Sequence, residues 1–204
     1  MRRNAALSAC PSSSIPVSSA RACQGPSLVI ISPNDPAAMI QYAEECRTLG
    51  VPFIFDPGQQ CARMSGSELR DGIVGAKIVI CNDYEFELIR QKCEMGEDEV
   101  LRVAEVLIVT RGENGCSIYS GKDRTDVKAV PPSRIVDPTG VGDAFRGGLM
   151  KGLAIGASYQ ASAQLGSVAA TYALEHLGGQ SHAYTVAEFS ARHEKHFGAA
   201  PALA

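Results

Sequence analysis

A glycine-rich segment, residues 137–149, carries the residue types best suited to phosphate chemistry; it reads DPTGVGDAFRGGL. Gly140 and Gly142 let the backbone approach a phosphate closely, and the free N–H groups at the start of a following helix favour negative charge. Asp143, at the same helix start, could act as a general base that takes the proton of a hydroxyl group attacking a phosphoryl group. The alternative is that Asp143 only caps the helix, because aspartate is a favoured N-cap residue.

The elements that position this segment are predicted from short apolar runs that alternate with helical patterns after residue 26. This alternation is typical of βαβ units with right-handed crossovers, so the predicted fold class is α/β with a mostly parallel sheet. We expect strands at residues 28–31, 52–55, 78–81 and 106–110, an antiparallel hairpin at 116–119 and 127–130, and helices at 36–49, 65–74, 84–93, 97–104, 144–153, 159–176 and 186–196. Ile135 and Val136 are expected to end a strand directly before the glycine-rich segment.

Composition favours small-molecule chemistry. The 204 residues, 45% hydrophobic and 20% charged, suit one globular domain, and a net charge of -3 gives no field that attracts nucleic acid or a membrane. The sequence contains no run of about 18 apolar residues, so it predicts no transmembrane helix. Seven cysteines without a CxxC pair indicate neither a disulfide framework nor a zinc site, and we interpret them as reduced thiols of a cytoplasmic protein. His193 and His196 lack matching metal ligands and are expected at the surface.

The first 26 residues differ from the rest of the chain. They contain no acidic residue and are rich in Ser, Ala and Pro, a composition that cannot bury a core. We predict a disordered or wrongly assigned leader over residues 1–26, which we favour over an organellar transit peptide. The domain is then expected over residues 27–198, followed by a short tail over 199–204.

Four segments stand out in order along the chain: Asp56-Pro57 after a predicted strand, residues 82–85, residues 110–115 and residues 137–145. They resemble, in the same order, a strand exit, the Asn-x-x-Glu motif, the Thr-x-Gly-x-x-Gly turn and the Asp-Thr-x-Gly-Ala-Gly-Asp-x-Phe signature of the ribokinase-like (PfkB) family of carbohydrate and nucleoside kinases. Val141 replaces the usual Ala or Cys. Within the family, the combination is most similar to bacterial adenosine kinases.

The resemblance implies a fold and an activity. The fold would be a ribokinase-like three-layer α/β/α arrangement, and the activity an ATP-dependent transfer of the γ-phosphoryl group to a hydroxyl of an adenosine-like nucleoside or a sugar. Asp143 would be the base. The N–H groups of Gly140, Val141 and Gly142 would form the anion hole that stabilises charge on the phosphoryl group.

The resemblance also implies two cation sites. Asn82 and Glu85 would organise Mg²⁺ and the nucleotide phosphates, because a hard cation prefers carboxylate and amide oxygens with retained water. The alternative for this pair is an Asx cap followed by an exposed helix acid. The backbone around Asp137 and Thr139, with the turn at residues 178–179, corresponds to the monovalent-cation site of the family, which would take K⁺.

Further residues are assigned to the nucleotide cleft by the same resemblance. Thr110 and Gly112 would line it, although Gly112 could also be only a hairpin glycine, and Gln180 would lie near the edge of the nucleotide base. Arg111 and Arg146 could contact phosphate. We expect both instead to be solvated or salt-bridged.

The sequence departs from the family at its start. Members carry an N-terminal region with the first strands, a β lid, an aspartate that grips the acceptor and a Gly-Gly-x-x-x-Asn segment, and residues 1–26 show none of these. We therefore expect a partial domain that binds Mg²⁺–ATP weakly, transfers no appreciable phosphate, and is poorly soluble or homo-oligomeric. A catalytically inactive nucleotide-binding module remains the alternative.

Overall fold

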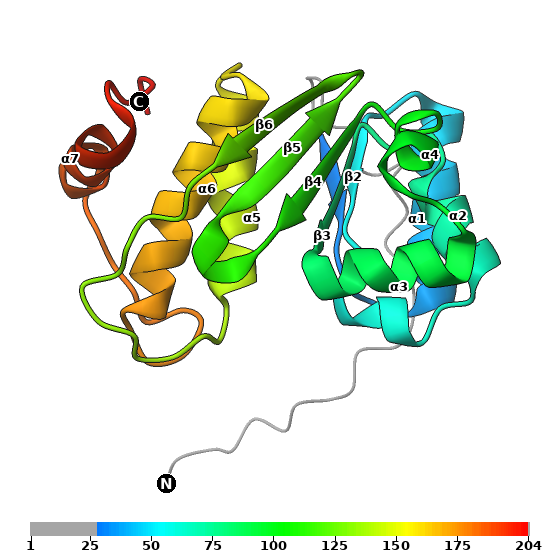
Figure 1. Ribbon diagram of the computed structural model, residues 1–204, viewed down its shortest axis with the longest axis horizontal. Helices are drawn as coiled ribbons and strands as arrows, with labels where there is room; N and C mark the ends of the chain where they lie inside the picture. Colours follow the sequence, from blue (N-terminus) through cyan, green and yellow to red (C-terminus); the bar gives the residue numbers. More distant parts are fainter. Residues whose placement is uncertain (1–27, 204) are drawn as a thin grey trace, which may run out of the picture.

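The computed structural model describes residues 28–203, in which a six-stranded sheet lies between two layers of helices (Figure 1). The strands lie in the sheet in their order along the chain: β1 (Val29–Ile31), β2 (Phe53–Phe55), β3 (Ile78–Asn82), β4 (Val106–Thr110), β5 (Cys116–Ser120) and β6 (Asp123–Val127). Strands β1 to β4 are parallel, and β5 and β6 are antiparallel to their neighbours. The predicted α/β class and mostly parallel sheet are confirmed.

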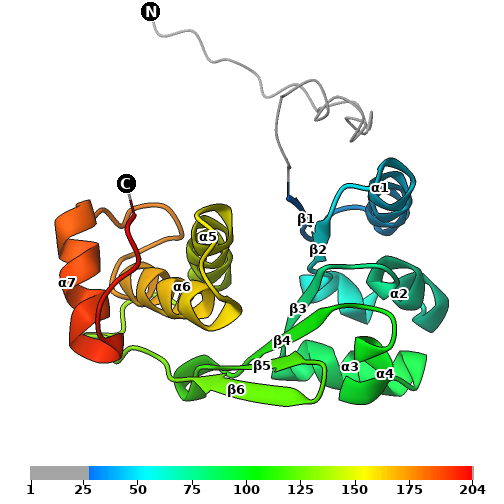
Figure 2. The same cartoon turned by 90° about the horizontal axis from the view of Figure 1, so that it is seen from above.

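The helices divide between the two faces of the sheet (Figure 2). One face carries α1 (Pro36–Leu49), α2 (Gly66–Ile73), α3 (Asp83–Cys93) and α4 (Glu97–Leu101), and the other carries α5 (Val141–Ala154) and α6 (Tyr159–Leu174). Helix α7 (Val186–Phe197) packs outside α6. Two short 3-10 helices, η2 (Gly58–Ala62) and η3 (Gly112–Asn114), follow β2 and β4.

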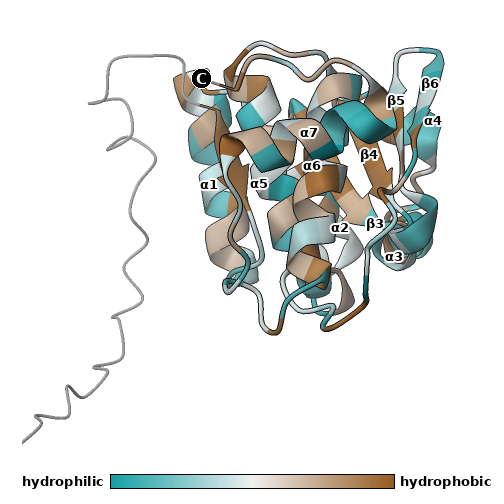
Figure 3. Cartoon of the chain, turned by 90° about the vertical axis from the view of Figure 1, so that its left-hand side faces the viewer, coloured by the Kyte–Doolittle hydropathy of each residue, from teal (hydrophilic) through white to brown (hydrophobic). Residues whose placement is uncertain are grey.

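Alternate strand residues build two separate cores. Phe53 and Phe55 pack with the core under α1 to α4, whereas Ile54 packs with the core under α5 and α6. All three are fully buried, as expected for a strand with both faces covered. Figure 3 shows the hydrophobic residues gathered between the helical layers and a hydrophilic β6 at the edge of the sheet.

Helices α5 and α6 approach each other closely through glycines. A Cβ atom on Gly148 would lie 2.6 Å from the carbonyl oxygen of Leu165, and one on Gly152 would lie 2.5 Å from the Ser162 hydroxyl oxygen. Real Cβ atoms do not approach neighbours so closely, so only glycine allows this spacing. The contact fixes α5, and with it the N-terminus of α5, against the rest of the domain.

The second strand of the hairpin differs from its predicted position. Ser120 pairs with Asp123, so Gly121 and Lys122 alone form the turn and β6 runs from Asp123 to Val127. The sequence predicts this strand at residues 127–130 because apolar residues occur there. An edge strand tolerates the polar run before them, because β6 is the last strand of the sheet and most of its residues are exposed.

The strand predicted at Ile135 and Val136 is also wrong. The chain leaves the sheet after Val127, and residues 128–140 form no strand. Three prolines in this stretch lack the N–H group that a strand ladder needs. The N–H of Val136 donates instead to the carbonyl of Leu174 on α6, so the glycine-rich segment follows a loop.

His193 is buried, although the sequence predicts it at the surface. It is only 1% exposed; its ring meets the ring of Phe197 on the same helix α7, and its Nδ1 lies 3.2 Å from the Gly198 carbonyl oxygen. Burial lowers the pKa of His193. The five described cysteines are free and buried.

The predicted leader over residues 1–26 lies outside the described residues and stays a prediction. Over residues 28–203, the structure contains no helix with the length and apolar character needed to cross a membrane.

Candidate active site

Polar residues end three neighbouring parallel strands. Asp56 directly follows β2, Asn82 is the last residue of β3, and Thr110 is the last residue of β4. Asn82 and Thr110 are partners in the strand register. Because the carboxyl ends of parallel strands meet at one edge of a sheet, these three residues lie at the edge where α/β proteins bind ligands.

A cleft of about 740 Å³ opens at this edge. Its volume falls in the range of roughly 300–1,000 Å³ that is usual for small-molecule sites. The lining comes from β3, the start of α3, the end of β4 with the turn after it, the start of β5, the loop after β6, α5 and α6. It includes Asn82, Glu85, Thr110, Gly112, Cys116, Val130, Pro131, Val141, Gly142, Phe145, Arg146 and Thr171. The cleft therefore has a polar end at the strand termini and α5, and an apolar wall.

The start of α5 requires glycine at its cap. Gly140 is the N-cap residue with φ +77°, and a Cβ atom there would lie 2.5 Å from the Cα of Gly179. Val141 donates its N–H to the Pro138 carbonyl at 3.3 Å, so one N–H of the predicted anion hole is already weakly engaged. Gly142 lies in the first turn, where a helix provides no internal acceptor, and its N–H can face an anion.

Asp143 is the third residue of α5, and it does not cap the helix. The cap is Gly140, and the side chain of Asp143 is 86% exposed. The alternative that Asp143 is only an N-cap residue is therefore wrong. Its Oδ1 accepts a hydrogen bond of 3.2 Å from Nη1 of Arg146, which lines the cleft. Asp143 itself is not among the lining residues and stands beside the cleft next to Gly142.

Arg146 also contacts Asp56, so it joins α5 to the end of β2. Its Nη2 donates to Asp56 Oδ1 at 2.8 Å, and its Nε lies 2.5 Å from Asp56 Oδ2. Asp56 is completely buried, and burial raises its pKa to about 6 even though the guanidinium of Arg146 lowers it. The prediction that Arg146 is salt-bridged is confirmed.

Asn82 and Glu85 form a capping box at the start of α3. Asn82 Oδ1 accepts from the Glu85 N–H at 2.7 Å, and Glu85 Oε2 accepts from the Asn82 N–H at 2.8 Å. The predicted Asx cap is thus present, but Glu85 is buried at 9% exposure and not an exposed helix acid. Both residues line the cleft, so the capping box holds one carboxylate and one amide at its polar end.

The turn after β4 is shaped by two glycines. Gly112 has φ +53° and lines the cleft. Gly115 has φ +82°, and a Cβ atom there would overlap the Val127 carbonyl oxygen, so the turn packs directly on the end of β6. Arg111 points to the hairpin, where Nη2 donates to the Tyr119 hydroxyl at 3.0 Å and Nη1 lies 4.0 Å from Asp126, as expected for a salt-bridged residue.

Asp137 fixes the loop before α5. Its Oδ1 accepts from the Thr139 N–H at 2.8 Å and its Oδ2 from the Gly178 N–H at 2.8 Å. The hydrogen bonds from Thr139 and Gly178 lower the pKa of Asp137. The carboxylate thus ties the glycine-rich segment to the turn after α6. Gln180, in that turn, is exposed and is not among the residues lining the cleft.

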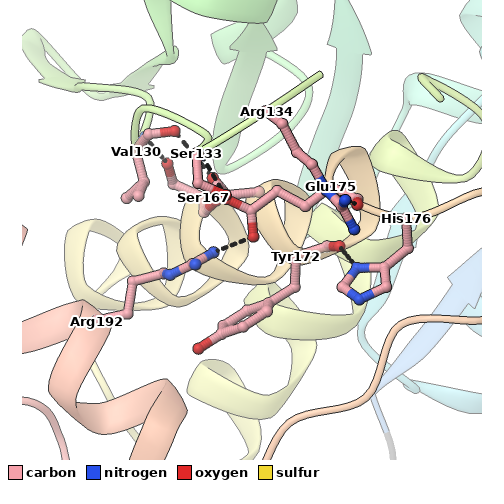
Figure 4. A network of polar contacts seen from close by, with 9 residues as sticks. Val130, Ser133, Arg134, Ser167, Tyr172, Glu175, His176 and Arg192 are labelled. Atoms are coloured by element: carbon pink, nitrogen blue, oxygen red, sulfur yellow. Dashed lines mark hydrogen bonds and ion pairs between the residues drawn. The ribbon is translucent and has the colours of Figure 1, made fainter. Parts of the chain in front are cut away.

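A network of polar contacts surrounds Glu175, which directly follows the cleft residue Leu174 (Figure 4). Glu175, 5% exposed, accepts from the Ser133 N–H at 2.6 Å and from Arg192 of α7 at 2.9 Å. Burial raises the pKa of Glu175, but the hydrogen bonds from Ser133 and Arg192 outweigh it and hold the pKa below its usual value. Arg192 also stacks over the Tyr172 ring at 4.0 Å. The network joins the loop before Asp137 to α6 and α7.

The sequence does not reveal the contact between Asp56 and Arg146. It places Asp56 at the end of a strand and predicts a solvated or salt-bridged Arg146. It does not predict that the two residues pair, because 90 residues separate them in the chain. The available signal is an aspartate ending a buried strand together with an arginine one helical turn after Asp143.

Comparison with known proteins gives the family. The model of the pfkB family of carbohydrate kinases matches residues 4–185. A nucleoside kinase of Methanocaldococcus jannaschii is 28% identical over 170 residues, which are 83% of this chain and 56% of that protein. The structure of Burkholderia thailandensis nucleoside kinase in complex with inosine superimposes with a TM-score of 0.83 at 41% identity, covering 85% of this chain and 57% of that one. The chain therefore belongs to the pfkB family of carbohydrate kinases.

Two further relatives add names of ligands and substrates. A cytidine kinase of Thermococcus kodakarensis is 31% identical over 162 residues, covering 74% of this chain and 56% of that protein. The same Burkholderia enzyme in complex with ADP-inosine gives a TM-score of 0.82 and covers 85% of this chain and 55% of that one. The chain thus spans a little over half the length of these relatives.

Proposed function

We propose that the cleft binds ATP and that Asp143 accepts the proton of an acceptor hydroxyl as the γ-phosphoryl group is transferred to it. One observation carries this proposal: an exposed carboxylate, Asp143, stands on the first turn of α5 beside the polar end of a cleft of about 740 Å³. A carboxylate beside a bound phosphate repels it, so Asp143 is an unfavourable neighbour for the anion alone. General-base catalysis gives it a purpose.

The phosphates would lie at the start of α5. The N–H groups of Gly140, Val141 and Gly142 form the proposed anion hole, of which the Val141 N–H also donates to the Pro138 carbonyl at 3.3 Å. Thr110 and Gly112 would hold the nucleotide from the opposite side. Gln180 remains a proposed neighbour of the base, although it is exposed and is not among the residues lining the cleft.

Magnesium fits the polar end of the cleft. Residues 28–203 contain no group of three or more His, Cys, Asp or Glu side chains that could hold a metal by themselves. Mg²⁺ commonly binds through one or two carboxylates together with phosphates and water, so Glu85 with Asn82 suffices when a nucleotide is present. The ion would neutralise charge on the phosphates. A monovalent cation such as K⁺ would use backbone carbonyls near Asp137 and Thr139, because the Asp137 carboxylate already binds two N–H groups.

The acceptor class that we propose is a nucleoside, with a sugar as the second class. Support comes from relatives named nucleoside kinase and cytidine kinase and from the inosine complex of the Burkholderia enzyme. A 2-dehydro-3-deoxygluconokinase of Escherichia coli, 26% identical over 166 residues, supports a sugar as the second acceptor class. The buried free cysteines support the proposed cytoplasmic location.

A second candidate is a nucleotide-binding module without turnover of its own. It is favoured by one fact: none of the described residues 28–203 is assigned to the acceptor. The described residues hold the proposed nucleotide, metal and base groups. Orienting an acceptor contributes roughly 7–11 kcal/mol to catalysis, so a module without that function would bind nucleotide and transfer almost nothing.

One experiment separates the two candidates. The 204-residue chain is incubated with Mg²⁺–ATP and, in turn, inosine, adenosine, cytidine or ribose, and ADP release is measured beside calorimetric titration with Mg²⁺–ADP. ADP release that depends on the acceptor and is lost in Asp143→Asn supports the kinase. Nucleotide binding without such release supports the module. Absence of both nucleotide binding and ADP release contradicts both candidates.

A further inference from the structure

One arginine links the proposed base to the buried end of β2. Arg146 lies one turn after Asp143 on α5 and contacts both Asp143 and Asp56. Nη2 and Nε face the two carboxylate oxygens of Asp56 at 2.8 and 2.5 Å, whereas Nη1 donates to Asp143 Oδ1 at 3.2 Å. Nη2 and Nη1 therefore each donate one hydrogen bond, to Asp56 and to Asp143, and Nε adds a close ionic contact with Asp56 that lacks hydrogen-bond geometry.

The two ends of this bridge differ in exposure. The side chain of Asp56 is 0% exposed, that of Arg146 is 18% exposed and that of Asp143 is 86% exposed. One hydrogen bond from Nη2 and one close ionic contact from Nε hold the guanidinium against the buried Asp56 carboxylate. The Asp56 contact thus fixes Arg146, and the remaining nitrogen is presented to Asp143 from a rigid support.

An exposed aspartate ordinarily samples several rotamers, and exposed ion pairs are weak because both side chains must be ordered. Here only Asp143 has to be ordered, since Asp56 has already fixed its partner. Over the described range 28–203, the polar contacts of the Asp143 carboxylate come from Arg146 alone. The orientation of Asp143 therefore depends on Arg146.

We propose that Arg146, anchored by the buried Asp56, is a positioning residue that holds the Asp143 carboxylate in one orientation beside the cleft. The proposal rests on the proposed function, because it gives the orientation of Asp143 a catalytic purpose. Arg146 acts through Asp143. Asp56, at the end of another strand and on the opposite side of the contact, would then serve the reaction without touching a substrate.

The direct test is the χ1 rotamer of Asp143, measured by NMR from three-bond couplings between the Cγ carbon and the backbone nitrogen and carbonyl carbon in the isotope-labelled 204-residue chain. We expect values of a single rotamer in the wild type and rotamer-averaged values in Arg146→Gln. Asp56→Asn should move the couplings in the same direction. If the Asp56→Asn variant does not fold, Arg146→Gln decides the outcome alone.

Arg192→Gln is a matched control. Arg192 also pairs with a buried carboxylate, Glu175, at 2.9 Å, and the two side chains are 24% and 7% exposed. Its loss should destabilise the fold to a similar degree and leave the Asp143 couplings unchanged. Single-rotamer couplings in Arg146→Gln, or averaged couplings in Arg192→Gln, would overturn the proposal.

Kinetics provide a second measurement. In a chain that transfers phosphate, Arg146→Gln should lower kcat by about ten- to a hundredfold, with KM for Mg²⁺–ATP changed by less than about twofold, because an ill-oriented base slows the chemical step without weakening nucleotide binding. An unchanged kcat would count against the proposal. A wild-type chain without transfer would refute the kinase activity, whereas the rotamer measurement would still decide the role of Arg146.

Discussion

Adjacent glycines on α5 should respond to the same substitution in opposite ways. Gly147 and Gly148 lie in the middle of the helix, where alanine is favoured over glycine by about 1 kcal/mol. A Cβ atom on Gly147 meets nothing within 4 Å. A Cβ atom on Gly148 meets the Leu165 carbonyl oxygen and carbon at 2.6 and 2.7 Å and the Gly166 Cα at 2.8 Å.

The size of the effect follows from these contacts. All three neighbours of Gly148 are backbone atoms, so no side-chain rotation relieves the clash and the two helices must separate. Overpacking of this kind costs about 1–3 kcal/mol. Because the gain in helix propensity is the same in both variants, Gly147→Ala should exceed Gly148→Ala in unfolding free energy by about 1–3 kcal/mol, with Gly147→Ala above the wild type by about 0.5–1 kcal/mol.

The assay is urea unfolding of both variants and the wild type, followed by circular dichroism. A parallel thermal scan should show about 2–4 °C of difference in Tm for each kcal/mol in a domain of this size. Equal stability of Gly147→Ala and Gly148→Ala would show that α5 and α6 do not pack at the described spacing. It would also contradict the conclusion that this contact fixes the N-terminus of α5.

Three further predictions concern the site itself. Asp143→Asn should lower kcat by about 10²–10⁴-fold in an active preparation and leave the Kd of Mg²⁺–ADP unchanged, which calorimetry can check; near-normal turnover would remove Asp143 as base. Gly142→Val should weaken Mg²⁺–ADP binding, because the side chain occupies the anion position and its Cβ lies 2.9 Å from Arg146 Nη1; an unchanged Kd would contradict the anion hole. Burial raises the pKa of Asp56 in the folded protein from 3.8 to about 6, so the protonated carboxyl group stabilises the fold, and this contribution is lost as pH rises through about 6. The side chain introduced by Asp56→Asn does not titrate. Between about pH 5 and about pH 7.5, the unfolding free energy of the wild type should therefore fall by about 1 kcal/mol relative to that of Asp56→Asn, and a constant difference in urea unfolding would refute the pKa shift.

Much of the fold follows from local signals in the sequence. The helix predicted at residues 36–49 has its observed bounds, because Asp35 accepts from the N–H groups of Ala37 and Ala38, Pro36 opens the helix and Gly50 ends it in the left-handed region. The strand predicted at residues 106–110 likewise has its observed bounds.

The errors arise where tertiary contacts override local pattern. Apolar character predicts a strand at Ile135 and Val136, which are 76% and 43% exposed in a loop held by α6. His193 is expected at the surface because local pattern does not show that the C-terminal residues after α7 cover it. The pairing of Asp56 with Arg146 cannot be predicted from either residue, since only the packing of α5 against the sheet brings them together.

The proposed nucleotide site is tested most directly by locating a bound nucleotide on the chain. Mg²⁺–ADP is titrated into the isotope-labelled 204-residue chain, and backbone amide shifts are followed by NMR. We expect shifts centred on Asn82, Gly112 and Gly142, with little change in α7. Absence of binding, or shifts confined to the smaller cavity of about 310 Å³ lined by Tyr184 and Phe189, would contradict the proposed nucleotide site.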